Sequence, residues 1–188
     1  MNDTINIALK EWDALCAALL SGRQAILLRK GGIYEAAGEF ELEHSRFLLF
    51  PTFLHQKRDL VKSPFQGLIN PATAEPQAVA VPAFCEVRLV RSVPSREAFD
   101  ALDDLHMWAP PFVDMRFAYR PQYPLYLIVV ETFRLPAPVA LPNTPAYAGC
   151  KSWVPLEQPV SIAGAERALA PEELQRVLQR VDEAFGGR

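Results

Sequence analysis

The feature that most constrains the fold is the apolar run PLYLIVVETFRL at residues 124–135. Its β-branched and aromatic residues favour a strand that crosses the core. Further strand patterns lie at QAILLR (24–29), at FELEH and RFLLFPTF (40–53) and at FCEVRLVRSV (84–93). Helical patterns do not alternate with these strands, which argues against a wholly parallel sheet. The sequence therefore predicts an α+β protein with a mixed, strongly curved sheet or a small β-barrel, flanked by helices.

Three segments have the periodicity of amphipathic helices. Apolar residues three and four positions apart predict helices over 5–20, 96–106 and 171–185. Gly22 follows the first of these, where a helix end can adopt positive φ. Between the strands, residues 63–82 are rich in Pro, Ala, Gln and Asn and predict a surface insertion. The proline-rich passage after Leu135 predicts little regular hydrogen bonding.

The chain has 188 residues, half of them hydrophobic, which fits a single domain over 1–188. The formal charge is -3, so a nucleic-acid surface would have to be a local patch. No signal peptide and no apolar run long enough for a membrane span are visible, so we expect a cytoplasmic protein. The three cysteines lack CxxC spacing, and neither a P-loop nor GxGxxG is present. We therefore expect no cofactor. The sequence does not indicate an oligomeric state.

Candidate binding residues begin with Arg29 and Lys30, which end an apolar strand and precede two glycines. On a continuing strand the two side chains point to opposite faces, and a cation on the core side needs an anionic partner. One interpretation is an anion site supported by backbone donors of the glycine turn. The other is a strand end with solvated charges.

A second group of candidates lies in LHMWAPPFVDMRFAYRPQY, residues 105–123. Aromatic residues interleaved with Arg116 and Arg120 are typical of surfaces that stack on bases and hold phosphates. Trp108 is one candidate for stacking. The alternative is that the aromatics cover the core while the arginines pair with nearby acids, namely Asp100, Asp103 and Asp104.

Two further motifs add polar candidates, FPTFLHQ with His55 and Gln56, and GCKSW with Lys151 and Trp153. An amide such as Gln56 can read a base edge or satisfy a loop. The histidines match no metal-ligand spacing, so we expect no metal site. Cys150 lacks a local group, apart from Lys151, that would make it a nucleophile.

LLRKGGI, FPTFLHQ and GCKSW, in that order, resemble the bacterial family called domain of unknown function 1802. The resemblance runs from about Ala8 to Leu156. It implies no particular activity.

The chain also resembles, more distantly, the ASCH domains, which are PUA-like barrels with the signature G-x-K-x-x-E-x-R. Gly22 and Arg29 occupy the first and last signature positions. Gln24 and Leu27 replace the lysine and the glutamate, so the resemblance implies the fold more than a catalytic activity. ASCH and PUA-like domains typically bind RNA or modified nucleotides, and some hydrolyse nucleoside derivatives.

Taken together, these features predict an anionic ligand, RNA or a nucleotide, bound in a cleft. The expected ligand-binding residues are Arg29, Lys30, His55, Gln56, Arg116, Arg120, Lys151 and Trp153.

Two other functions are kept open. The first is a metal-dependent nuclease of the PD-(D/E)xK type, with Glu86 and Arg88 at the E-x-K position and Glu11 on the first helix. The second is a protein-interaction module that uses the proline-rich segment 135–155.

Overall fold

The computed structural model describes residues 3–30, 35–36, 39–40, 43–72, 74–148 and 152–186. The strands are β1 (Thr4–Trp12), β2 (Ile26–Arg29), β3 (Glu35–Ala36), β4 (Glu39–Phe40), β5 (Arg46–Thr52), β6 (Ala78–Ser92), β7 (Tyr126–Pro142), β8 (Trp153–Ser161) and β9 (Glu166–Arg167). The α-helices are α1 (Asp13–Leu20), α2 (Arg96–Asp100), α3 (Pro110–Ala118) and α4 (Pro171–Phe185). Short 3-10 helices lie at Arg58–Leu60, Ser63–Leu68, Asp103–Leu105 and Pro145–Tyr147.

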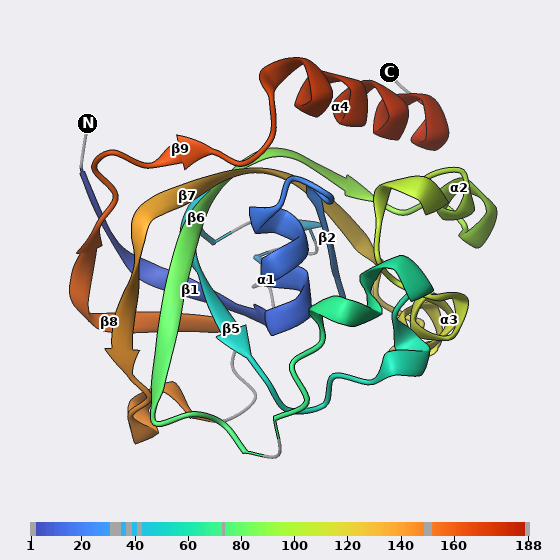
Figure 1. The fold of residues 1–188 in the computed structure, drawn as a ribbon. Coiled ribbons are helices and arrows are strands. Elements are labelled where there is room, and N and C mark those ends of the chain that lie inside the picture. The colour runs from blue at the N-terminus through green and yellow to red at the C-terminus, as the bar shows by residue number, and fades with distance from the viewer. Residues whose placement is uncertain are drawn as a thin grey trace.

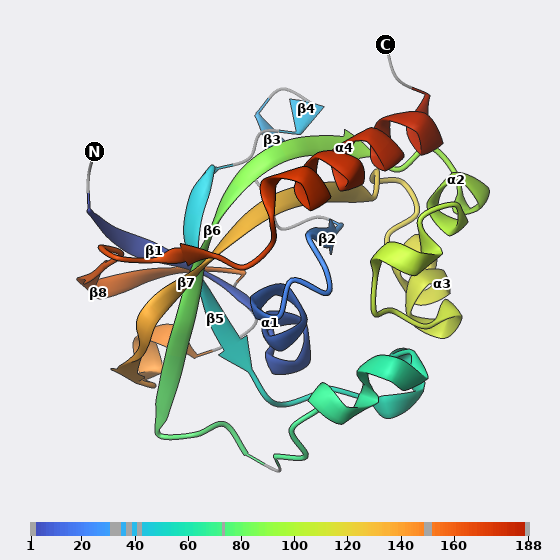
Figure 2. The same ribbon diagram turned by 45° about the horizontal axis from the view of Figure 1, so that its top comes forward.

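One mixed sheet of seven strands organises the molecule, in the order β2-β7-β6-β5-β1-β8 with β9 added beside β7. Strands β1 and β5 are parallel, and the other pairs are antiparallel. The sheet is strongly curved and open, and α1 lies on its concave side (Figure 1). Figure 2 shows α4 running along the outside of the curve, with α2 and α3 beside one end of the sheet. The predicted α+β class with a strongly curved mixed sheet is confirmed.

The curvature arises in the long β6–β7 ribbon. Its register shifts between Val81 and Ala83, and again between Val87 and Leu89. Pro82 lies inside the first shift, where the missing N–H of a proline removes no ladder hydrogen bond. Bulges of this kind bend a strand and increase its twist. The ribbon can therefore wrap around α1.

The same shift corrects the expectation for the proline-rich passage. Arg134 pairs with Ala83, and pairing resumes at Val139, which faces Val81. The prolines that follow Leu135 therefore lie at an irregularity, and β7 continues to Pro142. The prediction of little regular hydrogen bonding was wrong for this part of the chain.

The predicted helix over 5–20 is corrected to a strand followed by a helix. Residues Thr4–Trp12 form β1, paired with β5 on one side and β8 on the other, and only Asp13–Leu20 is helical. Ile5 and Ile7 are β-branched and suit a strand. Their spacing from the apolar residues of α1 also fits a helical stripe, so periodicity alone could not separate the two.

Other boundaries differ as well. The expected insertion at 63–82 ends earlier, because residues 78–82 belong to β6. The helix expected over 96–106 divides into α2 and a 3-10 turn at Asp103–Leu105. Helix α3 and strand β8 were not predicted. Helix α4 spans Pro171–Phe185, the same range as the expected C-terminal helix.

Two buried clusters form the core. The larger packs α1 against the sheet and includes Leu19, Ile26 and Phe47. The smaller is built from alternate residues of the same strands, such as Phe50 of β5, together with Tyr147. No helix in the described part of the chain has both the length and the apolar character that a membrane crossing needs.

Candidate functional site

A cleft lies where the two core clusters meet, and it has two parts. The smaller, here called the cationic hollow, has a volume of about 300 Å³. Its walls come from β1, β2, β5, α1 and α3. The larger hollow has a volume of about 870 Å³ and extends toward the segment that follows β7. The two hollows adjoin each other and share four lining residues: Lys10, Trp12, Arg29 and Thr52.

Arg29 ends β2 at the floor of the cationic hollow. Its guanidinium forms an ion pair with Glu11, and its Nη2 donates a hydrogen bond to the carbonyl oxygen of Lys10 at 2.9 Å. The Arg29 and Glu11 side chains are only 14% and 13% exposed. Arg29 Nε is buried and has no hydrogen-bond partner among the described residues. The ion pair between Arg29 and Glu11 thus leaves the buried Nε–H of Arg29 without an acceptor among the described residues.

Arg116 projects from α3 into the same hollow. No hydrogen bond or ion pair joins it to the described residues, and its Nε is buried without a partner. Burial lowers the pKa of Arg116 and the charge of Arg29 lowers it further, whereas Glu11 raises it. Two guanidinium groups therefore repel each other across the hollow, with one carboxylate near both.

Lys30 adds a third positive charge close by. Its side chain is buried, and Nζ donates to the carbonyl oxygen of Phe117 at 2.7 Å. Burial lowers the pKa of Lys30, and the charge of Arg116 adds to this effect. The side chains of Arg29 and Lys30 therefore reach different partners, one on β1 and one on α3. Both contribute positive charge to the same region.

Glu11 is the only acidic residue among the described residues that line the cationic hollow. Burial raises the pKa of its carboxyl group, and this outweighs the opposing charges of Arg29 and Arg116 and the hydrogen bond from Arg29. An excess of cations over anions in a partly dry site favours an anionic ligand.

Aromatic side chains form one wall of the cationic hollow. The rings of Trp108 and Phe112 stack with centroids 5.7 Å apart, and Phe112 meets the Trp12 ring edge-on at 5.3 Å. Trp108 is almost fully buried, whereas Trp12 is half-buried and lines both hollows. Phe112 is also half-buried, and Trp12 is the one of these three rings that lines both hollows.

The larger hollow carries a mixture of polar groups. His55 lies on its rim, exposed and with φ of 68°. The carboxylate of Glu75 accepts hydrogen bonds from the backbone N–H groups of Phe53 and Leu54, both at 3.1 Å. Lys10 Nζ donates to the carbonyl oxygen of Tyr147. These contacts tie Glu75 to the chain just after β5, and β1 to the segment that follows β7.

The family of the chain follows from comparison with known sequences. A model of the family described as Domain of unknown function (DUF1802) matches residues 8–180. The chain belongs to this family. No curated protein matched the chain.

Solved structures similar to this DUF1802 chain include the ASCH protein of Zymomonas mobilis, at 11% identity and a TM-score of 0.43, with 92% of this chain and 93% of that one covered. A serine-to-alanine variant of that protein has 11% identity, a TM-score of 0.42 and coverage of 95% and 98%. A tyrosine-to-phenylalanine variant has 12% identity, a TM-score of 0.40 and coverage of 92% and 96%. All three are structures of the ASCH domain, the kind of domain that the sequence distantly resembles.

The DUF1802 cleft brings together only some of the predicted site residues. Arg29 and Arg116 line the cationic hollow, Lys30 lies within electrostatic reach of Arg116 without lining it, and His55 lines the larger hollow. Gln56 has a structural role, because its Oε1 accepts a hydrogen bond from the N–H of Ala14 at 2.9 Å at the start of α1.

Arg120 and Trp153 do not line the cleft. Arg120 is exposed and lies over the ring of Tyr119, 5.3 Å from its centroid. Trp153 packs against Phe47 and His44, with centroids 5.2 and 5.1 Å away. Lys151 lies outside the described residues.

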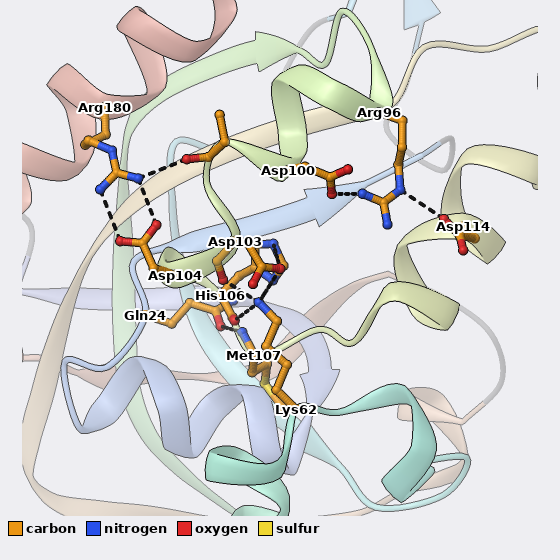
Figure 3. A network of polar contacts seen from close by, with 11 residues as sticks. Gln24, Lys62, Arg96, Asp100, Asp103, Asp104, His106, Met107, Asp114 and Arg180 are labelled. Atoms are coloured by element: carbon orange, nitrogen blue, oxygen red, sulfur yellow. Dashed lines mark hydrogen bonds and ion pairs between the residues drawn. The ribbon is translucent and has the colours of Figure 1, made fainter.

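The acids that could have neutralised Arg116 and Arg120 are paired elsewhere (Figure 3). Asp100 pairs with Arg96, Asp103 with Lys62 and Asp104 with Arg180. The alternative that these acids bind Arg116 and Arg120 is therefore wrong. The other part of that alternative, that the aromatic residues cover the core, holds for Trp108, which is buried.

The nuclease alternative gains no support from the described residues. Glu86 pairs with Arg88 at 2.6 Å and Arg46 at 3.5 Å, on the β6 and β5 strands. Glu11 lies on β1 rather than on a helix, and its carboxylate faces Arg29. No cluster of three or more potential metal ligands occurs among the described residues.

Sequence reasoning missed Lys10, Glu11, Trp12 and Thr52 as cleft residues. The first three were assigned to a helix, which obscured their position beside the end of β2. A signal was available, because the β-branched residues at the start of this segment favour a strand. A strand here would have placed Glu11 on the sheet that also carries Arg29.

Proposed function

We propose that this chain binds a phosphate-bearing ligand, RNA or a nucleotide, in its two-part cleft. The observation that carries the proposal is the convergence of Arg29 and Arg116 on the single carboxylate of Glu11, with Lys30 close to Arg116. Guanidinium groups present several donors in a plane and match the geometry of phosphate oxygens. The unused buried donors of Arg29 and Arg116 are the groups that a phosphate would satisfy.

The aromatic wall supports a nucleotide over a simple inorganic anion. Trp12 lies between the two hollows and is backed by Phe112. A base stacked on an aromatic ring contributes about 1–3 kcal/mol in single-stranded complexes. The phosphate would lie at the guanidinium groups while the base occupies the ring, and the larger hollow has room for an adjoining sugar or nucleotide.

Binding is tested with the variant Arg116→Gln, because Arg116 holds no structural hydrogen bond among the described residues. The probes are a short single-stranded RNA and a nucleoside monophosphate, each titrated over a range of salt concentrations. We expect Arg116→Gln to weaken RNA binding about tenfold, which corresponds to about 1.4 kcal/mol. The slope of log K against log salt should decrease by about one.

A matched control is Arg176→Gln on α4, whose partner Glu173 lies on the same exposed helix surface. It removes the same charge far from the cleft walls and should leave affinity and salt slope unchanged. Binding of RNA but not of the monophosphate would assign the site to a strand, and the reverse would assign it to a free nucleotide. Equal affinity of Arg116→Gln and the unaltered protein for both probes would refute the proposal.

The interaction-module alternative makes a different prediction. Protein partners held by segment 135–155 should bind with little salt dependence, whereas phosphate contacts give a steep one.

A further inference from the structure

One carboxylate faces the cations of the cationic hollow. Glu11 occupies the Arg29 guanidinium, which the proposed function assigns to a ligand phosphate. We infer that Glu11 is an internal competitor of the ligand, so that phosphate binding at Arg29 requires the Glu11 carboxylate to take up a proton. This inference rests on the proposed function and adds a determinant of affinity and pH dependence to the same site.

The contacts around Arg29 explain why the two anions would compete. Arg29 Nη2 already donates to the carbonyl oxygen of Lys10 and contacts the Glu11 carboxylate. Only the Nε donor is buried without a partner. A phosphate that approaches this guanidinium therefore meets the Glu11 carboxylate on the same cation, and two adjacent anions repel.

None of the titratable neighbours of Glu11 described next changes the charge of the hollow near neutral pH. Arg29 from β2 and Arg116 from α3 attract the carboxylate, and the thiols of Cys16 on α1 and Cys85 on β6 lie within electrostatic reach. Burial raises the pKa of Cys85 to about 12, and it raises that of Cys16 well above its usual value. Both thiols therefore stay neutral at physiological pH.

Asp13 is the next acid along the chain, and burial raises its pKa too, but it does not line the cationic hollow. Glu11 is thus the group in the hollow whose protonation changes the charge seen by a ligand. Burial already favours its neutral form, and the arrival of a phosphate would favour it further.

A bound phosphate raises the proton affinity of Glu11, so phosphate binding takes up protons. By linkage, a lower pH therefore strengthens phosphate binding. Affinity for an RNA whose phosphodiesters stay ionised should rise as pH falls toward the pKa of Glu11. Replacing Glu11 with an uncharged residue of the same shape should remove this dependence.

The test compares Glu11→Gln with the unaltered protein, with a short single-stranded RNA titrated from mildly acidic to mildly alkaline pH. We expect Glu11→Gln to bind about tenfold more tightly at the alkaline end and to show a flat profile. The control Asp114→Asn removes one negative charge from the exposed face of α3, where Asp114 pairs with Arg96, and should behave as the unaltered protein.

A second measurement needs no variant. Calorimetric titration of the unaltered protein in two buffers of different ionisation enthalpy should reveal proton uptake on RNA binding. RNA binding without proton uptake, or with the same pH profile in Glu11→Gln, would refute the role of Glu11 and leave the proposed function standing. A failure of the unaltered protein to bind RNA or nucleotide at any pH would refute both.

Discussion

Gln56 shows how one side chain can stabilise the cleft without contacting a ligand. Its carbonyl oxygen accepts the N–H of Ala14, one of the free donors at the start of α1, and its amide donates to the carbonyl oxygen of Phe53 at 3.2 Å. The residue therefore ties the end of β5 to the first turn of α1. This role explains why FPTFLHQ carries an amide there.

We predict that Gln56→Ala lowers the free energy of unfolding by about 1 kcal/mol, because it leaves the Ala14 N–H without its partner. Urea denaturation measures the change. Gln179→Ala on α4 removes only an exposed contact with Glu183 and should have almost no effect. A destabilised Gln56→Ala that keeps its RNA affinity would support the structural role, whereas lost affinity at full stability would contradict it.

At the level of single residues, the sequence could predict the cationic side chains of the candidate cleft. Arg29 stood out because a charge ends a buried strand, and Arg116 because it lies among aromatics. Glu11 was named only for the nuclease alternative, because its contact with Arg29 depends on where the fold places β1 and β2. Trp153 was chosen as part of the GCKSW motif, and the fold packs it against Phe47.

Among the elements, the connection from α1 to β2 fixes where Arg29 lies. Gly22 has φ of 68°, its N–H donates to Leu19, and the N–H of Arg23 donates to Ala18. These are the two hydrogen bonds of a Schellman motif, which ends a helix through a left-handed residue. The sequence-based prediction of positive φ at Gly22 is confirmed.

We expect Gly22→Ala to destabilise the protein by about 2 kcal/mol. A Cβ on Gly22 would lie 2.6 Å from the backbone oxygen of Ala168, in addition to the cost of the left-handed conformation. The matched control Gly67→Ala has nothing within 4 Å of its added Cβ and should be close to neutral. Thermal unfolding of both variants measures the difference, and equal melting temperatures would disprove this explanation.

Hydrophobic periodicity predicted some elements of this chain correctly and others wrongly. Helix α4 was predictable, because its apolar stripe lies against the core on one side only. Strand β1 was not, because pairing with β5 and β8 overrides a pattern that fits both a strand and a helix. The β6–β7 ribbon needed the tertiary register to show that its prolines lie at an irregularity rather than at the end of the strand.

Across the whole molecule, a set of ion pairs joins strands on the sheet face away from α1. Glu131 of β7 contacts Arg88 of β6 and Arg167 of β9, and its side chain is only 7% exposed. Burial raises the pKa of Glu131, but the hydrogen bonds and charges of Arg167 and Arg88 outweigh it, so that the net pKa is below its usual value. These contacts connect β6, β7 and β9.

We predict that Glu131→Gln lowers stability by about 2 kcal/mol near neutral pH. Because the folded-state pKa is below the usual value of 4.5, the contribution is present above that pH and is lost as pH falls toward the folded-state pKa. Denaturation at several pH values should show the two proteins converging under acidic conditions. A difference that stays constant down to strongly acidic pH would argue against this electrostatic origin.

The central claim is that Arg29 and Arg116 together hold a phosphate in the cationic hollow. The most direct measurement is an NMR titration that follows the Nε–H signals of the arginines as single-stranded RNA is added. The account predicts that the signals of Arg29 and Arg116, whose Nε groups are buried without partners, shift together, while those of Arg120 and Arg176 stay in place. Shifts at Arg120 with none at Arg29 or Arg116 would contradict it.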